Sequence, residues 1–321
     1  MSATETLEFH NNSLLPLLFG EHNSHLSYLE KKLGIDISDR GNKISVSGDK
    51  HAVKTAHHIL NVLWEKLEHK EIIGPADIDA ALRFFNENKK NETANDKQGG
   101  DSKILLRTKK KNIAPRTPNQ EKYIKTILNN EMVFGIGPAG TGKTYLAVAA
   151  GVSMFLKGEV EKLIFCRPAV EAGENLGFLP GDMKEKIDPY LRPIYDALHD
   201  TLHWDYMLKK IESDEIEIAP LAFMRGRTLS NAFVVLDEGQ NATIGQMKMF
   251  LTRMGEASRM VITGDITQSD LPRGIKSGLQ DAYDTLSGVE EIKFHHFTTK
   301  DVVRHHLVGK IIDAYENKSR E

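Results

Sequence analysis

The chain has 321 residues, of which 40% are hydrophobic and 27% charged, the proportions of a globular protein with one large domain and a smaller companion. The formal net charge of −3 gives no support for nucleic-acid binding through overall charge, so any such contact must come from local basic patches. The single cysteine, Cys166, excludes an internal disulfide, and we expect a buried, inert thiol there.

No run of eighteen apolar residues is present, and the N-terminal stretch lacks the basic head and cleavage site of a secretory signal. We therefore expect a cytoplasmic protein with no membrane association. The 13 histidines are scattered or in adjacent pairs, without an HExxH pattern or cysteine partners. No histidine metal site is expected.

The N-terminal part of the chain carries the patterns of a small α+β domain. Apolar spacing predicts helices, and alternation predicts strands between them. The expected helices are 25–34, 52–67 and 76–88, and the expected strands are 35–38 and 43–48.

The stretch NENKKNETANDKQGGDSK, residues 86–103, is polar and nearly free of large apolar side chains, which is typical of a flexible linker. The next stretch, ILLRTKKKNIAPRT, consists of two short runs around a lysine cluster and predicts a basic hairpin. These features divide the chain into a small α+β domain over 1–85, a linker and hairpin over 86–115, and a larger domain over 116–321.

In the larger domain, strand and helix patterns alternate, and several strands are nearly continuous apolar runs. Such runs bury both faces, as in a mainly parallel sheet covered by helices, so we predict an α/β fold. The expected strands are 132–136, 163–166, 216–218, 233–236, 260–263 and 292–294.

The stretch GPAGTGKT follows the first of these strands and opens a long helix, which is the context of a phosphate-binding loop. Its amides would hold anionic oxygens, Lys143 would bridge the terminal phosphates, and the Thr144 hydroxyl would bind Mg²⁺. The predicted nucleotide-binding residues are Gly137, Pro138, Ala139, Gly140, Thr141, Gly142, Lys143 and Thr144.

Two further strands end in polar side chains suited to phosphate chemistry. Asp237, directly after the run AFVVL, would bind the metal, and Glu238 would act as the general base that orients the attacking water. Gln268, in MVITGDITQ, would contact the γ-phosphate and respond to its loss. The three elements together predict a hydrolysis site.

The strings GPAGTGKT, DEGQN and GDITQ resemble the motifs of the first RecA-like domain of superfamily-one helicases. The longer strings RPAVEAGENLGFLPGD, DPYLRPIYDAL, FMRGRTL and DLPRG resemble the PhoH-like ATPases of the YbeZ type, from about Arg116 to the end of the chain. Gly239 departs from that pattern, where a small residue such as Ala or Ser is usual.

The resemblance implies a RecA-like P-loop domain that hydrolyses ATP with Mg²⁺ in the cytoplasm and takes part in RNA metabolism. It also implies a homo-oligomer, with a hexameric ring as one arrangement, and a YbeY-type endoribonuclease as a partner. Because no second RecA-like domain is visible after GDITQ, we expect a neighbouring protomer to complete the site. The alternative is a nucleotide-gated adaptor that hydrolyses slowly and does not translocate.

The resemblance also suggests roles for residues outside the loop. Gln120 would hydrogen-bond adenine and favour ATP over GTP, unless it is a solvated helix residue. Gln240 would also sense the γ-phosphate. Arg304, or as second choice Arg273, would neutralise charge on the γ-phosphate, unless these are salt-bridged surface residues.

Two segments are candidates for RNA contact. One surrounds Arg167, Pro168, Glu171 and Gly173, with a packing loop or subunit contact as the alternative. The other is the lysine cluster Lys109–Lys111, flanked by Arg107 and Arg116, with a solvated basic run as the alternative.

The N-terminal domain resembles a degenerate KH module in the order of its elements. The stretch FGEHN stands where such modules have a GXXG loop that clamps nucleic acid, but Asn23 replaces the second glycine and Glu21 is acidic. The domain would therefore bind RNA weakly or serve as a protein-docking module.

Overall fold

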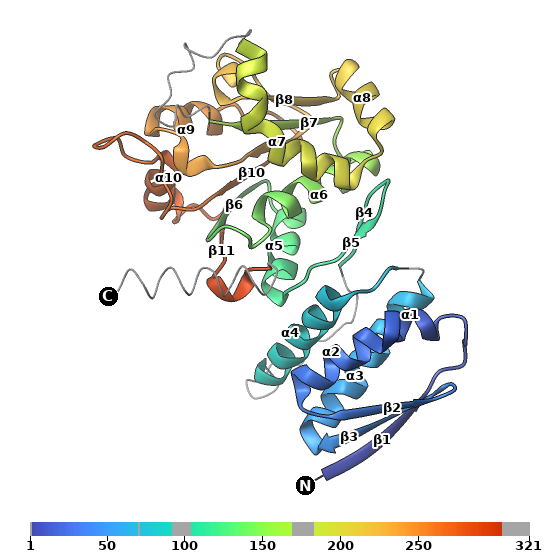
Figure 1. Ribbon diagram of the computed structural model, residues 1–321. Coiled ribbons are helices and arrows are strands. Elements are labelled where there is room, and N and C mark those ends of the chain that lie inside the picture. The colour runs from blue at the N-terminus through green and yellow to red at the C-terminus, as the bar shows by residue number, and fades with distance from the viewer. Residues whose placement is uncertain (1, 70, 92–103, 169–182, 304–321) are drawn as a thin grey trace. The chain divides into compact units, whose positions relative to one another are not determined.

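The computed structural model describes residues 2–69, 71–91, 104–168 and 183–303 (Figure 1). The chain forms two compact units, one made of Met1–Asp101 with Arg116–Pro118 and the other of Ser102–Pro115 with Asn119–Glu321. Within the described residues, no helix has the length and apolar character needed to span a membrane.

The first unit is a small α+β structure in which helices cover a three-stranded antiparallel sheet of order β1-β3-β2. Its elements are β1 (Ser2–Glu8), α1 (Leu15–Phe19), η1 (Glu21–Asn23), α2 (Ser24–Leu33), β2 (Asp36–Arg40), β3 (Lys43–Asp49), α3 (Lys50–Glu68) and α4 (Pro75–Asn91). The α+β prediction is confirmed, while α4 extends into the stretch predicted as linker.

Strand β1 was absent from the predicted elements, because its sequence SATETLE is almost wholly polar. It forms by pairing antiparallel with β3 along its whole length, from Ser2 opposite Asp49 to Glu8 opposite Lys43. Leu7 is buried in the core that the sheet shares with α3. Tertiary pairing thus supplies the strand that the local pattern does not indicate.

The loop that stands in the GXXG position has an unusual backbone. Gly20, His22 and Asn23 all have positive φ, of 74°, 53° and 58°. Asparagine tolerates the left-handed region better than most residues, so Asn23 supports the turn that a glycine was expected to provide.

The second unit is built on a six-stranded parallel sheet of order β11-β6-β10-β9-β7-β8. The predicted α/β fold and its six strands are confirmed, as is the two-stranded hairpin that precedes them. The strands are β4 (Leu106–Arg107), β5 (Asn112–Ile113), β6 (Met132–Ile136), β7 (Lys162–Arg167), β8 (Ile216–Pro220), β9 (Ala232–Leu236), β10 (Arg259–Gly264) and β11 (Ile292–His296).

Helices cover both faces of this sheet (Figure 1). They are α5 (Pro118–Asn129), α6 (Lys143–Leu156), α7 (Met183–Thr201), α8 (Trp204–Glu212), η3 (Leu221–Met224), η4 (Gly239–Asn241), α9 (Ile244–Leu251), α10 (Gly278–Leu286) and η5 (Thr299–Asp301). The fold is RecA-like, with β10 lying between the strand before the phosphate loop and the strand that ends at Asp237.

Side chains on the strands alternate between two separate hydrophobic clusters. Phe233 and Val235 pack with α5, α6 and α7 on one face, whereas Val234 and Leu236 pack with α9 and α10 on the other. All four are fully buried. Burial on both faces explains the continuous apolar runs that predicted a parallel sheet. Cys166 is likewise buried, and burial raises the pKa of its thiol, as expected for an inert cysteine.

His295 on β11 lies against the rings of Tyr123 and Phe297, with ring centroids 5.2 and 4.9 Å away. Burial among these rings lowers the pKa of His295 from its ordinary value of 6.5 to about 4. The folded chain therefore favours the neutral imidazole.

Because this pKa is lower in the folded chain than in the unfolded chain, the stabilisation is present above pH 6.5 and is lost as the pH falls toward 4. Over this window we expect the free energy of unfolding, measured by urea titration, to fall more steeply in the wild type than in His295→Phe. The same pH dependence in both proteins would contradict this account.

Candidate nucleotide-binding site

The stretch between β6 and α6 is a tight loop at the carboxyl edge of the sheet. Gly137, Gly140 and Gly142 have φ of 151°, 82° and 84°, which favour glycine. A Cβ atom on Gly137 would lie 2.6 Å from the Phe297 carbonyl oxygen. The loop is further fixed by the Thr141 hydroxyl, which donates to the Pro138 carbonyl at 3.0 Å.

Lys143 begins α6, where the unpaired amides of the first helical turn attract anions. Its ammonium group donates to the carbonyls of Gly137 and Pro138 at 2.6 and 2.9 Å, so the side chain curls back over the loop. A positive charge and a helix N-terminus thus meet at one place, which is the arrangement that binds phosphate.

Thr144 and Asp237 face each other across the site, although they are 93 residues apart in the sequence. The Thr144 hydroxyl donates to Asp237 Oδ1 at 2.6 Å, and the Thr263 hydroxyl on β10 donates to the same oxygen at 2.7 Å. The convergence of a hydroxyl and a carboxylate suits a Mg²⁺ ion that also binds phosphate oxygens. The described residues contain no group of three His, Cys, Asp or Glu side chains placed to hold a metal by themselves.

Glu238 follows Asp237 and has a left-handed backbone, with φ of 54°. Its two carboxylate oxygens have different partners. Oε1 lies 3.3 Å from Nη2 of Arg167, and Oε2 accepts a hydrogen bond from Nε2 of Gln240. The segment that includes Glu171 and Gly173 lies outside the described residues.

Gln240 is buried, and both ends of its amide bind protein groups. Besides the bond to Glu238, its Oε1 accepts the backbone N–H of Asp265 at 3.0 Å. Gln240 does not line the cavity described below. These contacts hold Gln240 between Glu238 and the end of β10, and its role as a sensor of the γ-phosphate stays a prediction.

The third motif follows β10. Asp265 Oδ1 accepts the N–H and the hydroxyl of Thr267 at 2.9 and 2.7 Å, which shapes the turn that carries Gln268 to the site. Arg273 is exposed farther along this loop, and Arg304 lies outside the described residues. Neither arginine is thus placed at the phosphate loop by the described contacts.

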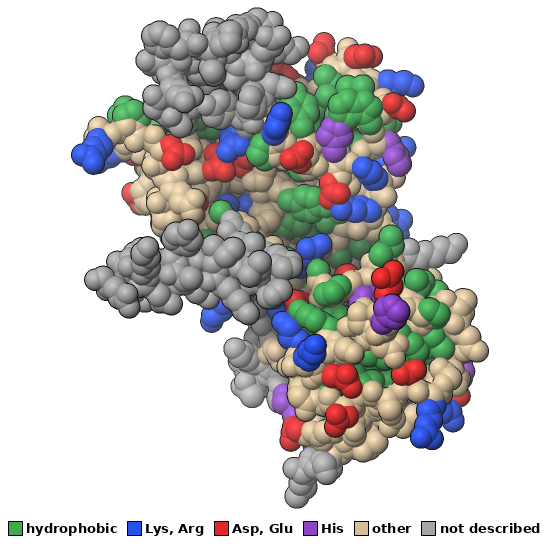
Figure 2. Space-filling model, in the orientation of Figure 1, with side chains coloured by type: hydrophobic (Ala, Val, Ile, Leu, Met, Phe, Trp, Pro, Cys, Tyr) green, Lys and Arg blue, Asp and Glu red, His purple; other side chains and the backbone are tan. Residues whose placement is uncertain are grey.

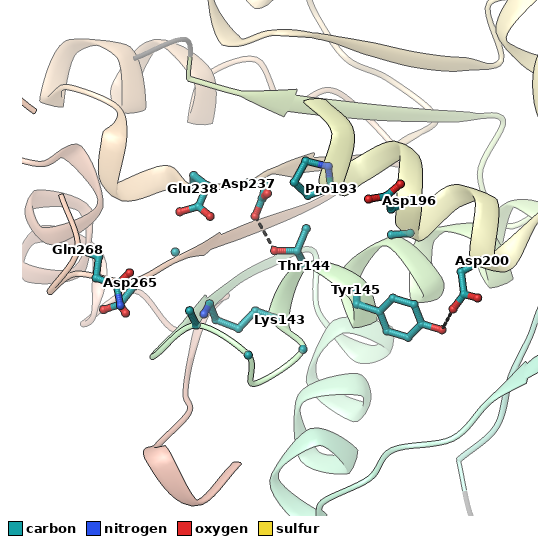
Figure 3. Close-up of a pocket in the computed structure, with 15 residues that line it drawn as sticks. Lys143, Thr144, Tyr145, Pro193, Asp196, Asp200, Asp237, Glu238, Asp265 and Gln268 are labelled. Carbon is teal, nitrogen blue, oxygen red and sulfur yellow. Dashed lines mark hydrogen bonds between the residues drawn. The ribbon is translucent and has the colours of Figure 1, made fainter. Parts of the chain in front are cut away.

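All these motifs open into one cavity of about 550 Å³ (Figure 3). Lys143, Thr144, Asp237, Glu238 and Gln268 line it, so the structure brings together the residues predicted from three separate motifs. In Figure 3, Asp265 and Gln268 lie at one end of the cavity and Tyr145 and Asp200 at the other, with Lys143 and Thr144 between them.

The sequence analysis missed the second wall of this cavity, which comes from α7. Its lining residues are Pro193, Asp196, Ala197 and Asp200, next to Tyr145 on α6. The Tyr145 hydroxyl donates to Asp200 Oδ2 at 2.7 Å. The four-residue spacing of Asp196 and Asp200 placed both on one helix face, but nothing in the sequence indicated which element that face would meet.

The predicted basic hairpin docks on this wall. Lys111 forms an ion pair with Asp200 and lies 5.9 Å from the centroid of the Tyr145 ring. Lys110 donates to the His199 carbonyl at 2.8 Å, and Lys109 lies 5.0 Å from the centroid of the Tyr206 ring. The exposed lysines therefore contact α7 and α8 rather than extending freely into solvent, and RNA contact by the cluster stays a prediction.

The same contacts keep Asp200 charged. Burial alone would raise the pKa of Asp200, but hydrogen bonds from Lys111 and Tyr145 outweigh it and hold the pKa below its ordinary value. Tyr145 is thus held by a charged acceptor at the end of the cavity.

Gln120 is buried rather than solvated, so the surface-residue alternative is wrong. Its Nε2 donates to the Thr141 carbonyl at 2.9 Å, which attaches α5 to the phosphate loop. The side chain therefore supports the loop, and its contact with adenine stays a prediction.

The Lys111–Asp200 pair is half exposed, so its contribution to stability is expected to be small. We expect a double-mutant cycle of Lys111→Ala and Asp200→Asn, followed by urea unfolding, to give a coupling energy of ~0.2–1 kcal/mol. A coupling energy of zero would show that the hairpin is held by other contacts.

Comparison with known proteins places this site in a family. The PhoH family, described as PhoH-like protein, matches residues 112–316. The PhoH-like protein of Bacillus subtilis strain 168 is 49% identical over 302 residues, which cover 94% of each chain. Protein PhoH of Escherichia coli K12 is 44% identical over 205 residues, covering 63% of this chain and 58% of its own.

A distant likeness was found among solved structures. The Pif1 helicase from Candida albicans has a TM-score of 0.34 and 15% identity over 63% of this chain and 43% of its own, and it adds nothing to the topology described above. The family match and the long alignments, together with the phosphate loop at the edge of a parallel sheet, show that this chain belongs to the PhoH-like proteins, a family of P-loop NTPases.

Proposed function

We propose that this protein hydrolyses ATP in the presence of Mg²⁺ and uses the energy to remodel RNA or a ribonucleoprotein. One observation carries the hydrolytic part: a cation, a hydroxyl–carboxylate pair and a second carboxylate from different motifs line one cavity beside a helix N-terminus. This combination provides phosphate binding, metal binding and a proton acceptor in a single site.

The residues present fit a bound Mg²⁺ ion. Thr144 and Asp237 would hold it through their oxygens, directly or through water, with phosphate oxygens completing its coordination. Bound there, the ion would supply positive charge that offsets the charge of the phosphates.

Lys143 would exchange its carbonyl partners in the loop for oxygens of the terminal phosphates. Glu238 would accept a proton from the water whose oxygen attacks the γ-phosphorus, while the bond to the bridging oxygen breaks and leaves ADP and phosphate. Gln268 would contact the γ-phosphate from the end of the cavity opposite Tyr145 and Asp200 (Figure 3).

The cavity contains more carboxylates than cations. Asp196, Asp200, Asp237, Glu238 and Asp265 line it, and Lys143 is the one basic residue among the lining residues in the described part of the chain. Additional positive charge would therefore favour transfer of the γ-phosphate. We propose Arg304, or else Arg273, as its source, supplied from a neighbouring protomer of a homo-oligomer such as a hexameric ring.

ATP is preferred over GTP in this proposal because Gln120, next to the phosphate loop, corresponds to the adenine-binding glutamine of the helicases that the motifs resemble. The test is a panel of nucleoside triphosphates with wild-type protein and Gln120→Ala. Loss of discrimination without loss of hydrolysis would support the assignment, whereas equal use of ATP and GTP by the wild type would contradict it.

RNA as the load, and a YbeY-type endoribonuclease as a partner, rest on the resemblance. The face in Figure 2 has basic and acidic side chains interspersed, with no broad basic surface. The lysines of the hairpin are bound to α7 and α8. The candidates for local RNA contact are the loop around Asn23, the surroundings of Arg167 and the exposed hairpin lysines.

Two variants test the hydrolytic site. Lys143→Ala is expected to weaken binding of a fluorescent ATP analogue at least ~10-fold, because it removes the charge beside the phosphates. Glu238→Gln is expected to keep that affinity and to lower kcat by ~10²-fold or more, because the amide cannot accept the proton. Lys157→Ala, at the exposed end of the same helix, is the matched control. Normal hydrolysis by Glu238→Gln would refute the general-base assignment.

The same preparations distinguish remodelling from a nucleotide-gated adaptor. An enzyme that acts on RNA should show RNA-stimulated hydrolysis or strand displacement, both lost in Glu238→Gln. An adaptor should bind ATP and show neither response.

A further inference from the structure

Glu238 has a backbone conformation that needs support from its surroundings. Its φ and ψ of 54° and 42° lie in the left-handed region, which is unfavourable for a residue with a long side chain. Non-glycine residues remain in this region when neighbouring groups hold them there, and such positions gather at functional sites. The groups that contact the Glu238 carboxylate are therefore informative.

One of these groups is Arg167, the last residue of β7. Strand β7 pairs with β9, with Cys166 opposite Leu236, and the Asp237 N–H extends this pairing by donating to the Cys166 carbonyl at 2.8 Å. The sheet therefore places Arg167 beside the turn that carries Glu238. The ion pair between them is largely shielded, with 20% of the Arg167 side chain and 36% of the Glu238 side chain exposed.

The other group is Gln240, which is 2% exposed. Its amide nitrogen donates to Glu238 and its oxygen accepts the N–H of Asp265, so it connects the turn after β9 with the end of β10. A Cβ atom on Gly264 would lie 2.6 Å from this oxygen, so the glycine leaves room for the contact. Gln240 is thus held in place by its contact with the end of β10.

We propose that Arg167 and Gln240 are positioning residues, which hold the Glu238 carboxylate in the orientation needed to accept a proton from the attacking water. This inference rests on the proposed hydrolytic function. Each carboxylate oxygen has two lone pairs and can accept a second hydrogen bond after the first. Arg167 and Gln240 can therefore fix the orientation of the carboxylate while it still accepts a hydrogen bond from water. The carboxylate lines the cavity while it is restrained by residues from β7 and from the turn after β9.

Restraint of this kind acts on the rate of the chemical step rather than on nucleotide affinity. Displacing a catalytic group by about an ångström can lower the reaction rate by up to ~10²-fold. Arg167 also places a positive charge beside Glu238, whose carboxylate lines the cavity together with those of Asp237 and Asp265. Its charge offsets repulsion that would otherwise turn Glu238 away from them.

The experiment measures kcat and KM for ATP hydrolysis with saturating Mg²⁺, and the Kd of a non-hydrolysable ATP analogue. Arg167→Ala and Gln240→Ala are expected to lower kcat ~10-fold or more while KM and Kd stay within ~2-fold of wild type. Arg167→Lys, which keeps the charge but not the planar fork, should retain more activity than Arg167→Ala.

Lys210→Ala is the matched control. This substitution removes the ion pair between Lys210 and Glu215, whose side chains are 26% and 35% exposed, close to the values for Arg167 and Glu238. Neither Lys210 nor Glu215 lines the cavity. The kcat of this variant should equal that of the wild type. Arg167→Lys also keeps the proposal falsifiable if Gln240→Ala, which alters a buried side chain, fails to fold.

A second arm uses Glu238→Asp, which shortens the side chain and already misplaces the carboxylate. If Arg167 acts through the position of Glu238, Arg167→Ala should lower kcat less than ~2-fold in this background. A full additive loss would overturn the proposal. So would an unchanged or increased kcat in Arg167→Ala, or a raised KM with normal kcat, which would mean that Arg167 contacts the nucleotide itself.

Failure of the proposed function would give a different result. If the wild type does not hydrolyse ATP, or if Glu238→Gln hydrolyses it normally, the hydrolytic site itself is wrong. If the wild type is active, Glu238→Gln is inactive and the Arg167 and Gln240 variants behave as wild type, the positioning role alone is wrong.

Discussion

The hydrogen bond between Thr144 and Asp237 is the contact on which the arrangement of the site depends. Strand β10 lies between β6 and β9, so the helix that follows β6 and the carboxylate that follows β9 must approach each other across an intervening strand. Thr263 on β10 donates to the same Asp237 oxygen. One buried carboxylate oxygen thus connects the ends of β6, β9 and β10. If these hydrogen bonds were absent, the buried charge of Asp237 would lack partners and would destabilise the fold.

Charge balance extends this constraint to the rest of the cavity. Its walls contain several carboxylates, and basic side chains behind the walls compensate some of them: Arg167 pairs with Glu238, and Lys111 pairs with Asp200. The second pair also fixes Tyr145, so the hairpin of β4 and β5 supports the end of the cavity farthest from Gln268. Lys111, which belongs to a basic run in the sequence, thus helps to hold the wall of the cavity in place.

The features that were predicted correctly have strong local signals. The central strands β6, β7, β9 and β10 are nearly continuous apolar runs because both faces of the parallel sheet are buried there. GPAGTGKT can take its conformation because glycine permits positive φ at three positions. Strand β1 and the α7 wall were missed for the opposite reason. A polar strand such as SATETLE forms through pairing with β3, and the two aspartates of α7 become a cavity wall only after that helix packs on α6.

The sequence by itself determined the class of fold, the phosphate loop and the identity of the acidic residues after β9, because each depends on the conformation or periodicity of neighbouring residues. Only the tertiary structure decided which side chains contact the phosphate loop and these acidic residues. The sequence singled out Arg167, Gln240 and Lys111 for contacts with RNA or phosphate, but their partners within the protein are chosen by strand order and helix packing. Contacts between distant segments depend on how the sheet is assembled, and a local pattern contains no information about that assembly.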